Sequence, residues 1–266
     1  MSKKRAFVRY TKSGEIVPGS LIITTNGGYP DKSSLWQEVI ADKCCGDGDN
    51  GGNCPPITPF CTENWAFENF DGTTFRNGDP IPEVTDDAAW ASLTTPAWCY
   101  YNNDTAFGRV YGKLYNGYAI MDPRGLAPEG WRIPVLEDWQ NLFNCIDCSP
   151  NDLLFGPGSK LKTSGFIDNN TGLWTIGFGI SSSTNEYGFS ILPSGYRSTD
   201  GQFLSSTNFT GIVAGGNNYA NFWTQEENIT NPGWVGCIIF DSQYHRVQYQ
   251  GNDKLYGQSV RLIKDI

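Results

Sequence analysis

A polar segment near the C-terminus carries the side chains best suited to binding a ligand. Residues 241–254 are almost all Gln, Asn, Asp, Tyr, His, Arg or Ser. Tyr and Trp offer large rigid contact areas, and short polar side chains offer adaptable hydrogen bonds, which is the chemistry of protein paratopes. We therefore predict a binding face within residues 223–256. Its candidate contact residues are Trp223, Gln225, Glu226, Asn228, Trp234, Gln243, Tyr244, His245, Gln248, Tyr249, Asn252, Asp253 and Tyr256.

The two tryptophans that flank this segment leave two roles open. One indole face of Trp223 or Trp234 could pack into the core while the other contacts a ligand. The alternative for the whole segment is a solvated polar loop that binds no partner. Exposed contact is predicted more clearly for four other side chains, which are Tyr244, His245, Tyr249 and Tyr256.

The chain has few side chains suited to catalysis, because His245 is its single histidine. A Ser-His-Asp triad or a His-based metal site would have to be built on it alone. Neither a G-x-S-x-G elbow nor an H-E-x-x-H motif accompanies it. We therefore predict no catalytic residue and a protein that is not an enzyme.

The cysteines form no complete zinc site. The sequence "CIDC" at 145–148 is half of a zinc site without a second CxxC. Four thiolates could also come from the cysteines between residues 44 and 61, but the adjacent Cys44 and Cys45 would be strained ligands. We therefore expect packing thiols and no metal. The cysteines of the chain are Cys44, Cys45, Cys54, Cys61, Cys99, Cys145, Cys148 and Cys237.

Calcium is likewise not part of the predicted site. This ion takes about six to eight oxygen ligands. The nearest group of oxygen-bearing side chains is Glu226, Glu227 and Asn228, with Asp253 later in the chain. Nothing in the sequence brings these side chains together, so we predict no cofactor.

Composition narrows the class of protein. The formal net charge of −9 argues against a nucleic-acid partner. No run approaches the roughly 18 apolar residues of a membrane helix, so we expect no membrane insertion. The N-terminus has a basic start but no apolar stretch of signal-peptide length, which predicts a protein made and left in the cytosol of its producing cell, with reduced cysteines.

The first 60 residues are predicted to form a small β segment. Residues 5–24 read as two short strands broken at "KSGE" and "PGS", and residues 34–42 could continue that sheet. The Gly-, Asp- and Asn-rich run that follows, with its paired prolines, reads as a linker or exposed loop. A segment of this size buries too little core to fold alone, so we expect it to dock or to oligomerise as a dimer or trimer.

Residues 61–266 are predicted to form one α+β domain with two helices. Residues 85–93 have a Thr cap and an acidic first turn. Residues 132–146 are the clearest helix, because apolar side chains follow Pro134 at helical spacing. Short strands are expected at 188–203, 221–228, 233–244 and 259–263. Tryptophans expected in the core are Trp65, Trp90, Trp98, Trp131, Trp139 and Trp174.

Four sequence blocks in this order resemble the Fibrobacter succinogenes major paralogous domain. The resemblance spans roughly residues 62–266. It implies a C-type-lectin-like fold, similar also to the formylglycine-generating sulfatase-modifying proteins, in modules displayed on cell surfaces or virions. The blocks are "TTFRNGDPIPEVTDDAAWASLTTPAWCYYNND" at 73–104, "YGKLYNGYAIMDPRGLAPEGWRIPVLEDWQNL" at 111–142, "YGFSILPSGYRSTDGQF" at 187–203 and "GQSVRLIKD" at 257–265.

The resemblance also assigns roles near the C-terminus. In such a fold the last strand is buried beside the first, so Val260, Leu262 and Ile263 would hold the scaffold. The chain has "WTQEE" at 223–227 where the family usually has a "WSSTE"-like run, and Gln258 replaces an aromatic residue of "GFSVR". Gln258 would loosen the packing that the aromatic residue normally supplies.

The N-terminal segment resembles a leader on virion proteins of crAss-like phages of gut Bacteroidetes. Together the two resemblances imply a bacteriophage virion protein (a head fibre, capsid decoration or tail-associated protein) assembled in the host cytoplasm. Its N-terminal segment would contact capsid or other virion proteins, and its C-terminal domain a host-surface or mucosal glycan or protein. The alternatives are a bacterial surface adhesin and a formylglycine-generating-type enzyme. The second is disfavoured because those enzymes use a C-terminal cysteine pair, and that region here holds only Cys237.

Overall fold

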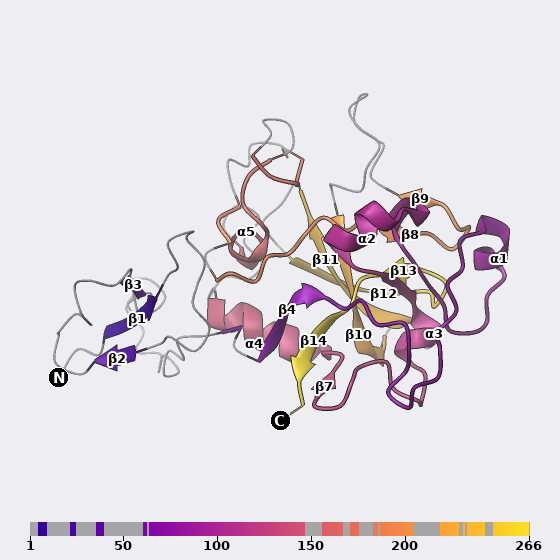
Figure 1. Cartoon of the computed structure of the whole chain (residues 1–266), viewed down its shortest axis with the longest axis horizontal. Coiled ribbons are helices and arrows are strands. Elements are labelled where there is room, and N and C mark those ends of the chain that lie inside the picture. The colour runs from indigo at the N-terminus through magenta and orange to yellow at the C-terminus, as the bar shows by residue number, and fades with distance from the viewer. Residues whose placement is uncertain are drawn as a thin grey trace. The chain divides into compact units, whose positions relative to one another are not determined.

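Figure 1 shows the computed structural model of the chain, which divides into two compact units, residues 1–61 and 62–266. In the first unit the structure describes the backbone of three strands and residue 61. In the second it describes residues 62, 64–146, 156–166, 171–175, 183–185, 187–204, 219–228, 231, 233–242 and 247–265.

The first unit contains a three-stranded antiparallel sheet in the order β2-β1-β3. Phe7 of the central strand pairs with Ile22 on one side and with Glu38 on the other. The two predicted strands and the predicted third strand are thus confirmed. Their bounds are β1 Arg5–Arg9, β2 Ile22–Thr24 and β3 Trp36–Val39.

The second unit is mixed α+β, with short helices and named strands that pair antiparallel, which agrees with the α+β class predicted. Its sheets have the strand orders β4-β14-β7, β5-β6-β13-β8-β9 and β10-β11-β12. The strands are β4 Trp65–Asn69, β5 Trp98–Cys99, β6 Leu114–Asn116, β7 Trp131–Arg132, β8 Tyr196–Arg197, β9 Phe203–Leu204, β10 Tyr219–Glu227, β11 Val235–Asp241, β12 Val247–Asn252, β13 Gly257–Gln258 and β14 Arg261–Lys264. The helices are α1 Asp87–Ala91, α2 Thr105–Tyr111, α3 Gly117–Ile120, α4 Leu136–Ile146, α5 Pro157–Leu161 and the 3₁₀ turn η1 Tyr101–Asn103.

Both predicted helices are present, as α1 and α4. The second unit also contains helices that the sequence did not predict. The additional helices are one or two turns long, and side-chain caps begin two of them, α2 and α3. Asp104 accepts a hydrogen bond from Ala106 N at the start of α2. Asn116 accepts one from Ala119 N at the start of α3. In α1 the capping residue is Asp86, not the predicted Thr85.

The closing strand lies where the resemblance placed it. β14 pairs with β4, the first strand of this unit, and on its other side with β7. Val260, Leu262 and Ile263 are buried, as predicted. Arg261 is buried as well, so both faces of this strand are covered.

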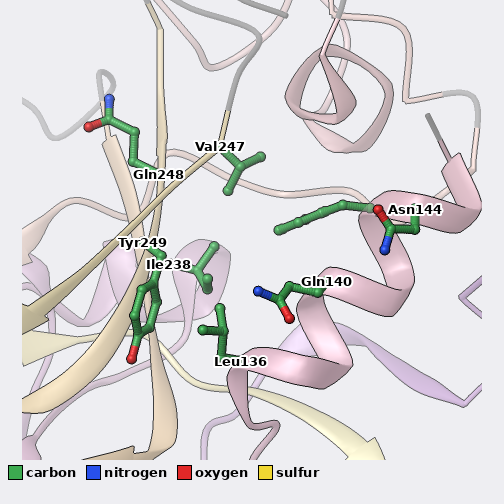
Figure 2. A pocket seen from close by; sticks show the side chains of 8 residues that line it. Leu136, Gln140, Asn144, Ile238, Val247, Gln248 and Tyr249 are labelled. Carbon is green, nitrogen blue, oxygen red and sulfur yellow. The ribbon is translucent and has the colours of Figure 1, made fainter. Parts of the chain in front are cut away.

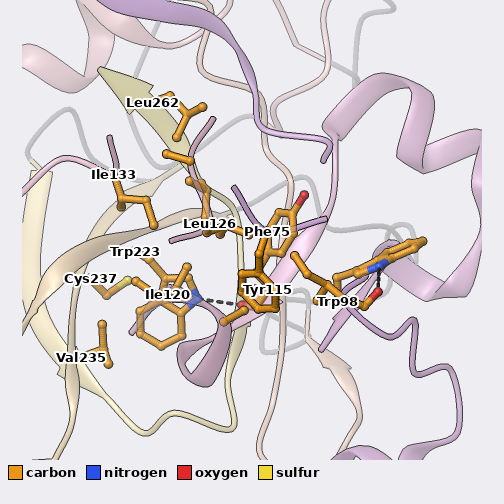
Figure 3. Packing of buried hydrophobic residues seen from close by; sticks show 14 residues of the cluster. Phe75, Trp98, Tyr115, Ile120, Leu126, Ile133, Trp223, Val235, Cys237 and Leu262 are labelled. Carbon is orange, nitrogen blue, oxygen red and sulfur yellow. Dashed lines mark hydrogen bonds between the residues drawn. The ribbon is translucent and has the colours of Figure 1, made fainter. Parts of the chain in front are cut away.

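The core joins residues from most of the second unit (Figure 3). Trp223 Nε1 donates to the Tyr115 carbonyl at 2.7 Å, and Trp98 Nε1 donates to the Ile81 carbonyl at 2.9 Å. A buried indole N–H is costly without such a partner. Six tryptophans were predicted to lie in the core. Five of them are buried, and Trp131 is partly exposed and packs against the core. The buried ones are Trp65, Trp90, Trp98, Trp139 and Trp174.

Among the described cysteines, two are free and two are in disulfides. Cys99 and Cys237 are free and buried. Cys61 and Cys145 are disulfide-bonded, so the expectation of packing thiols is wrong for them. Cys61 therefore supplies no thiolate to the zinc set considered above, whose other members lie outside the described residues.

Gln258, which replaces an aromatic residue of the family pattern, is fully buried. Its Oε1 accepts a hydrogen bond from Cys237 Sγ at 2.6 Å. Its Nε2 is buried and makes no hydrogen bond in the described part of the chain. An unpaired buried amide N–H is destabilising, so the position carries a polar cost that an aromatic residue would not.

Lys162, the residue that caps the C-terminus of α5, holds a buried amine with a perturbed pKa. Its Nζ donates to the Asp241 carbonyl at 2.7 Å and lies 5.0 Å from the centre of the Trp174 ring. Burial lowers the pKa of Lys162 to about 8, and the nearby charge of Asp241 opposes that shift.

We expect this amine to make stability rise with pH. In the unfolded chain the lysine pKa is about 10.4, so between that value and about 8 the unfolded state binds the extra proton and the free energy of unfolding increases with pH. Below pH 8 both states are charged, and the cost of burying the charge is present in full. Between pH 7 and pH 10.5 the free energy of unfolding of the wild type should rise by on the order of 2–3 kcal/mol relative to that of Lys162→Met. Denaturant titrations of both proteins across this range test it; a constant difference would contradict the account.

Candidate functional site

Of the predicted binding residues that the structure describes, most lie on strands β10 and β12 of the β10-β11-β12 sheet. β11 is central, and the described residues include no strand that pairs with the outer edge of β12. Tyr249 is paired with Ile238, and Gln248 with Ile239. Because neighbouring residues of a strand point to opposite faces, the polar residues of β12 are divided between the two faces of the sheet. They do not form one continuous surface.

A groove of about 340 Å³ lies between one face of this sheet and helix α4 (Figure 2). Phe143 of α4 packs edge-on against Phe240 of β11 and joins the two walls at their base. Two of the predicted residues, Gln248 and Tyr249, border the groove, and of the two only Tyr249 has its side chain on the face toward α4. The full lining is Leu136, Gln140, Phe143 and Asn144 of α4, Ile238 of β11, and Val247, Gln248 and Tyr249 of β12.

The lining is apolar and amide-bearing. Leu136, Ile238 and Val247 supply aliphatic surface between the two walls (Figure 2). Gln140 and Asn144 present exposed carboxamides from consecutive turns of α4. The phenol of Tyr249 is the one titratable side chain in the lining, and its pKa is raised, chiefly by burial and also by the charge of Glu226. The groove is therefore uncharged at neutral pH.

The orientation of Tyr249 depends on a glycine. A Cβ atom on Gly236 would collide with the Thr224 hydroxyl and lie 2.8 Å from the Tyr249 hydroxyl. The tyrosine can therefore lie across β11 because position 236 has no side chain. Asn228 contributes a hydrogen bond that opposes the rise in the pKa of Tyr249. The ring is thus positioned from two neighbouring strands.

Glu226, a predicted contact residue, helps to hold the helical wall of the groove. Its Oε1 accepts a hydrogen bond from Leu136 N at 2.8 Å, at the start of α4. The adjacent Gln225 N donates to the Pro134 carbonyl at 2.9 Å. A carboxylate at a helix N-terminus satisfies a free N–H and complements the helix dipole. Glu226 therefore positions α4 against β10.

Replacement of Glu226 should loosen this wall. We expect Glu226→Ala to lower the free energy of unfolding by about 1 kcal/mol, the usual cost of losing a helix cap. Glu227→Ala is the matched control, because Glu227 is the next residue of β10 and is exposed. It should change stability by less than about 0.5 kcal/mol. Thermal melts of both variants make the comparison, and equal effects would show that Glu226 does not hold the helix.

Several of the predicted contact residues are buried. Trp223 is 0% exposed and belongs to the core, and Asn228 and Asn252 are buried as well. Asp253 caps its own turn by accepting from Leu255 N, and Tyr256 is half-buried against Tyr196. Trp234, at 41%, and Gln225 are exposed. Gln243, Tyr244 and His245 lie outside the described residues.

Sequence reasoning missed the helical half of the groove. Leu136, Gln140, Phe143 and Asn144 follow the i, i+4, i+7, i+8 spacing that places side chains along one stripe of a helix. The stripe is recognisable in the sequence, but its spacing was used only to predict the helix. Gln140 and Asn144 lie at the border of that core face, where a polar residue can line a groove.

Other chemistry is not supported by the described residues. Among them, no group of three or more His, Cys, Asp or Glu side chains is placed to hold a metal ion. Burial raises the pKa of Cys99 to about 12 and that of Cys237 further, so both thiols are protonated at neutral pH. None of the described helices is long and apolar enough to cross a bilayer.

The model of the Fibrobacter succinogenes major domain matches residues 60–264. The chain belongs to this family, as its sequence blocks predicted. No curated protein and no solved structure matches the chain.

Proposed function

We propose that this protein is a bacteriophage virion structural protein that displays its second unit for host recognition. In this proposal the second unit is C-type-lectin-like and binds a host-surface or mucosal ligand, on a head fibre, capsid decoration or tail-associated protein. The membership of residues 60–264 in the family supports a displayed module. The resemblance of the N-terminal segment to virion proteins of crAss-like phages supports the location.

The groove between α4 and β12 is the observation that carries the binding role. Its walls are fixed by buried contacts, whereas the amides of Gln140 and Asn144 face outward from α4. A rigid scaffold with adaptable polar groups at an opening is the arrangement expected of a recognition site. The groove has no charged lining residue that could act as an acid, base or nucleophile at neutral pH.

The first unit suits an attachment role. Its sheet has strands of three to five residues, too small a structure to bury a large core. Such a unit gains stability by pairing with another surface. We propose that it docks on a capsid or other virion protein, or assembles the chain into a dimer or trimer.

A bacterial surface adhesin is the second candidate, and the disulfides of Cys61 and Cys145 favour it as much as they favour a released virion. Disulfides persist in oxidising surroundings outside the cell, where both kinds of protein would work. A formylglycine-generating-type enzyme is less well supported. Cys237 is buried and hydrogen-bonded to Gln258, and burial raises the pKa of its thiol. A buried protonated thiol is a poor nucleophile.

The virion proposal predicts incorporation through the first unit. Mass spectrometry of purified particles should detect the chain at a copy number of a structural protein. A phage encoding residues 62–266 alone should assemble particles that lack this protein, because the proposed attachment surface is gone. Normal incorporation of the shortened chain would contradict the attachment role, and particles that never contain the full chain would favour the adhesin.

A further inference from the structure

We propose that the groove between α4 and β12 binds an uncharged carbohydrate, without calcium, by stacking on Tyr249 and hydrogen bonding to Gln140 and Asn144. This inference rests on the proposed host-recognition function and specifies its ligand class. The assignment follows from the lining residues, from the partners that their polar atoms lack, and from the charge next to the groove.

The first step concerns the free hydrogen-bonding capacity of the groove. The side chains of Gln140 and Asn144 make no hydrogen bond to any described residue. The side chain of Gln248 points to the opposite face of the sheet, where its Nε2 donates to Asp241 Oδ2 at 3.3 Å, so it adds nothing to this capacity. Each carboxamide offers two donors and an acceptor. This mixture matches sugar hydroxyls, which donate and accept at the same oxygen.

The second step concerns charge. None of the residues that line the groove carries a charge at neutral pH. The carboxylate of Glu226 raises the pKa of Tyr249 by its negative charge, and it would repel an acidic ligand in the same way. A charged ligand would lose hydration on entry and find no opposite charge in return. A neutral ligand has neither cost.

The third step concerns shape and apolar contact. Leu136, Ile238 and Val247 form aliphatic surface beside the Tyr249 ring (Figure 2). Sugars present apolar C–H faces as well as hydroxyls, and an aromatic ring offers them a flat surface at low entropic cost. The volume of about 340 Å³ is near the lower end of small-ligand pockets, roughly 300–1,000 Å³. It suits a terminal unit of one or two sugar rings.

Calcium has no place in this site. The carboxylate of Glu226, which acts on Tyr249 from outside the lining, is engaged with the N-terminus of α4. No described cluster of carboxylates adjoins it that could hold a metal ion. Recognition would therefore depend on the amides and the ring alone and should persist when divalent ions are removed.

The test uses the full chain and matched variants of one helix. Chitotriose, cellotriose and maltotriose serve as neutral probes, and sialyllactose as an acidic probe, in saturation-transfer NMR with and without EDTA. Binding to intact gut Bacteroidetes cells and to mucin is measured in parallel. We expect at least one neutral probe to bind with or without EDTA, and Gln140→Ala and Asn144→Ala each to weaken it about five-fold, the effect of losing one hydrogen bond. Asn141→Ala is the control, because Asn141 is exposed on α4 but does not line the groove. It should bind within two-fold of the wild type.

The outcomes separate this inference from the proposed function. Three results would overturn the groove assignment while leaving host recognition intact. Asn144→Ala and Gln140→Ala could bind the probes as tightly as the wild type, the chain could bind sialyllactose alone, or binding could depend on calcium. Binding to cells through a protease-sensitive component and to no glycan probe would do the same. No binding to cells, mucin or glycans would overturn both.

Discussion

Replacement of Arg261 by Met is expected to cost about 3–5 kcal/mol of stability, the range for breaking a buried charged network. Arg261 is fully buried in β14. Its Nη1 donates to the carbonyls of Ala66 and Phe189, both at 3.1 Å, and also to the Phe67 carbonyl. Its Nη2 donates to Asn69 Oδ1 at 2.9 Å. Methionine keeps most of the aliphatic stem but leaves these acceptors without their donor, and the bond to the Phe189 carbonyl among them is buried.

The charge state of Arg261 does not weaken this expectation. Burial lowers the pKa of Arg261 to about 9, so the guanidinium remains charged at neutral pH. The control is Lys264→Met, which removes a cation from the exposed end of the same strand. It should change the free energy of unfolding by less than about 0.5 kcal/mol. Denaturant titrations compare the two, and similar losses would mean that β14 is not held by its arginine.

Replacement of Trp223 by Ala is the second large effect, about 3–5 kcal/mol. Trp223 is 0% exposed, and its indole N–H donates to the Tyr115 carbonyl. Cys237 of β11 is the residue paired with Trp223. Alanine at position 223 would leave a cavity between β10 and the core residues around Cys237. The carbonyl of Tyr115 would also lose its donor.

Trp234 provides the matched control for Trp223. The two tryptophans flank the same polar segment, but Trp234 is 41% exposed. Trp234→Ala should therefore cost less than about 1 kcal/mol. Thermal melts of both variants separate the core role from the surface role that the sequence left open for each. If Trp234→Ala lost as much stability as Trp223→Ala, both tryptophans would be core residues.

The sequence predicted those elements whose signal is periodic. α4 was found because its apolar residues recur at helical spacing and bury Trp139 and Leu142. β14 was found because Val260 and Leu262 alternate with polar neighbours. Helices α2 and α3 were missed because four to seven residues give too little periodicity. Their formation depends on caps and on packing with distant parts of the chain.

The candidate site was half predictable. Tyr249 and Gln248 were found from residue type, since an aromatic and an amide in a polar segment indicate contact. Their division between sheet faces required the register with β11. The role of Glu226 could not be found, because its partner Leu136 N lies 90 residues earlier in the chain. Asn252 was assigned to the surface from its polarity, whereas its position on β12 buries it.

The adsorption rate of phage particles to their host cells, measured with increasing amounts of the purified full chain, tests the central claim most directly. If the protein displays a host-binding module, the free chain occupies the same receptors. We predict that adsorption falls with its concentration and that Gln140→Ala/Asn144→Ala competes less well than Asn141→Ala. Adsorption that stays constant at saturating chain, in particles shown to contain the protein, would contradict the account.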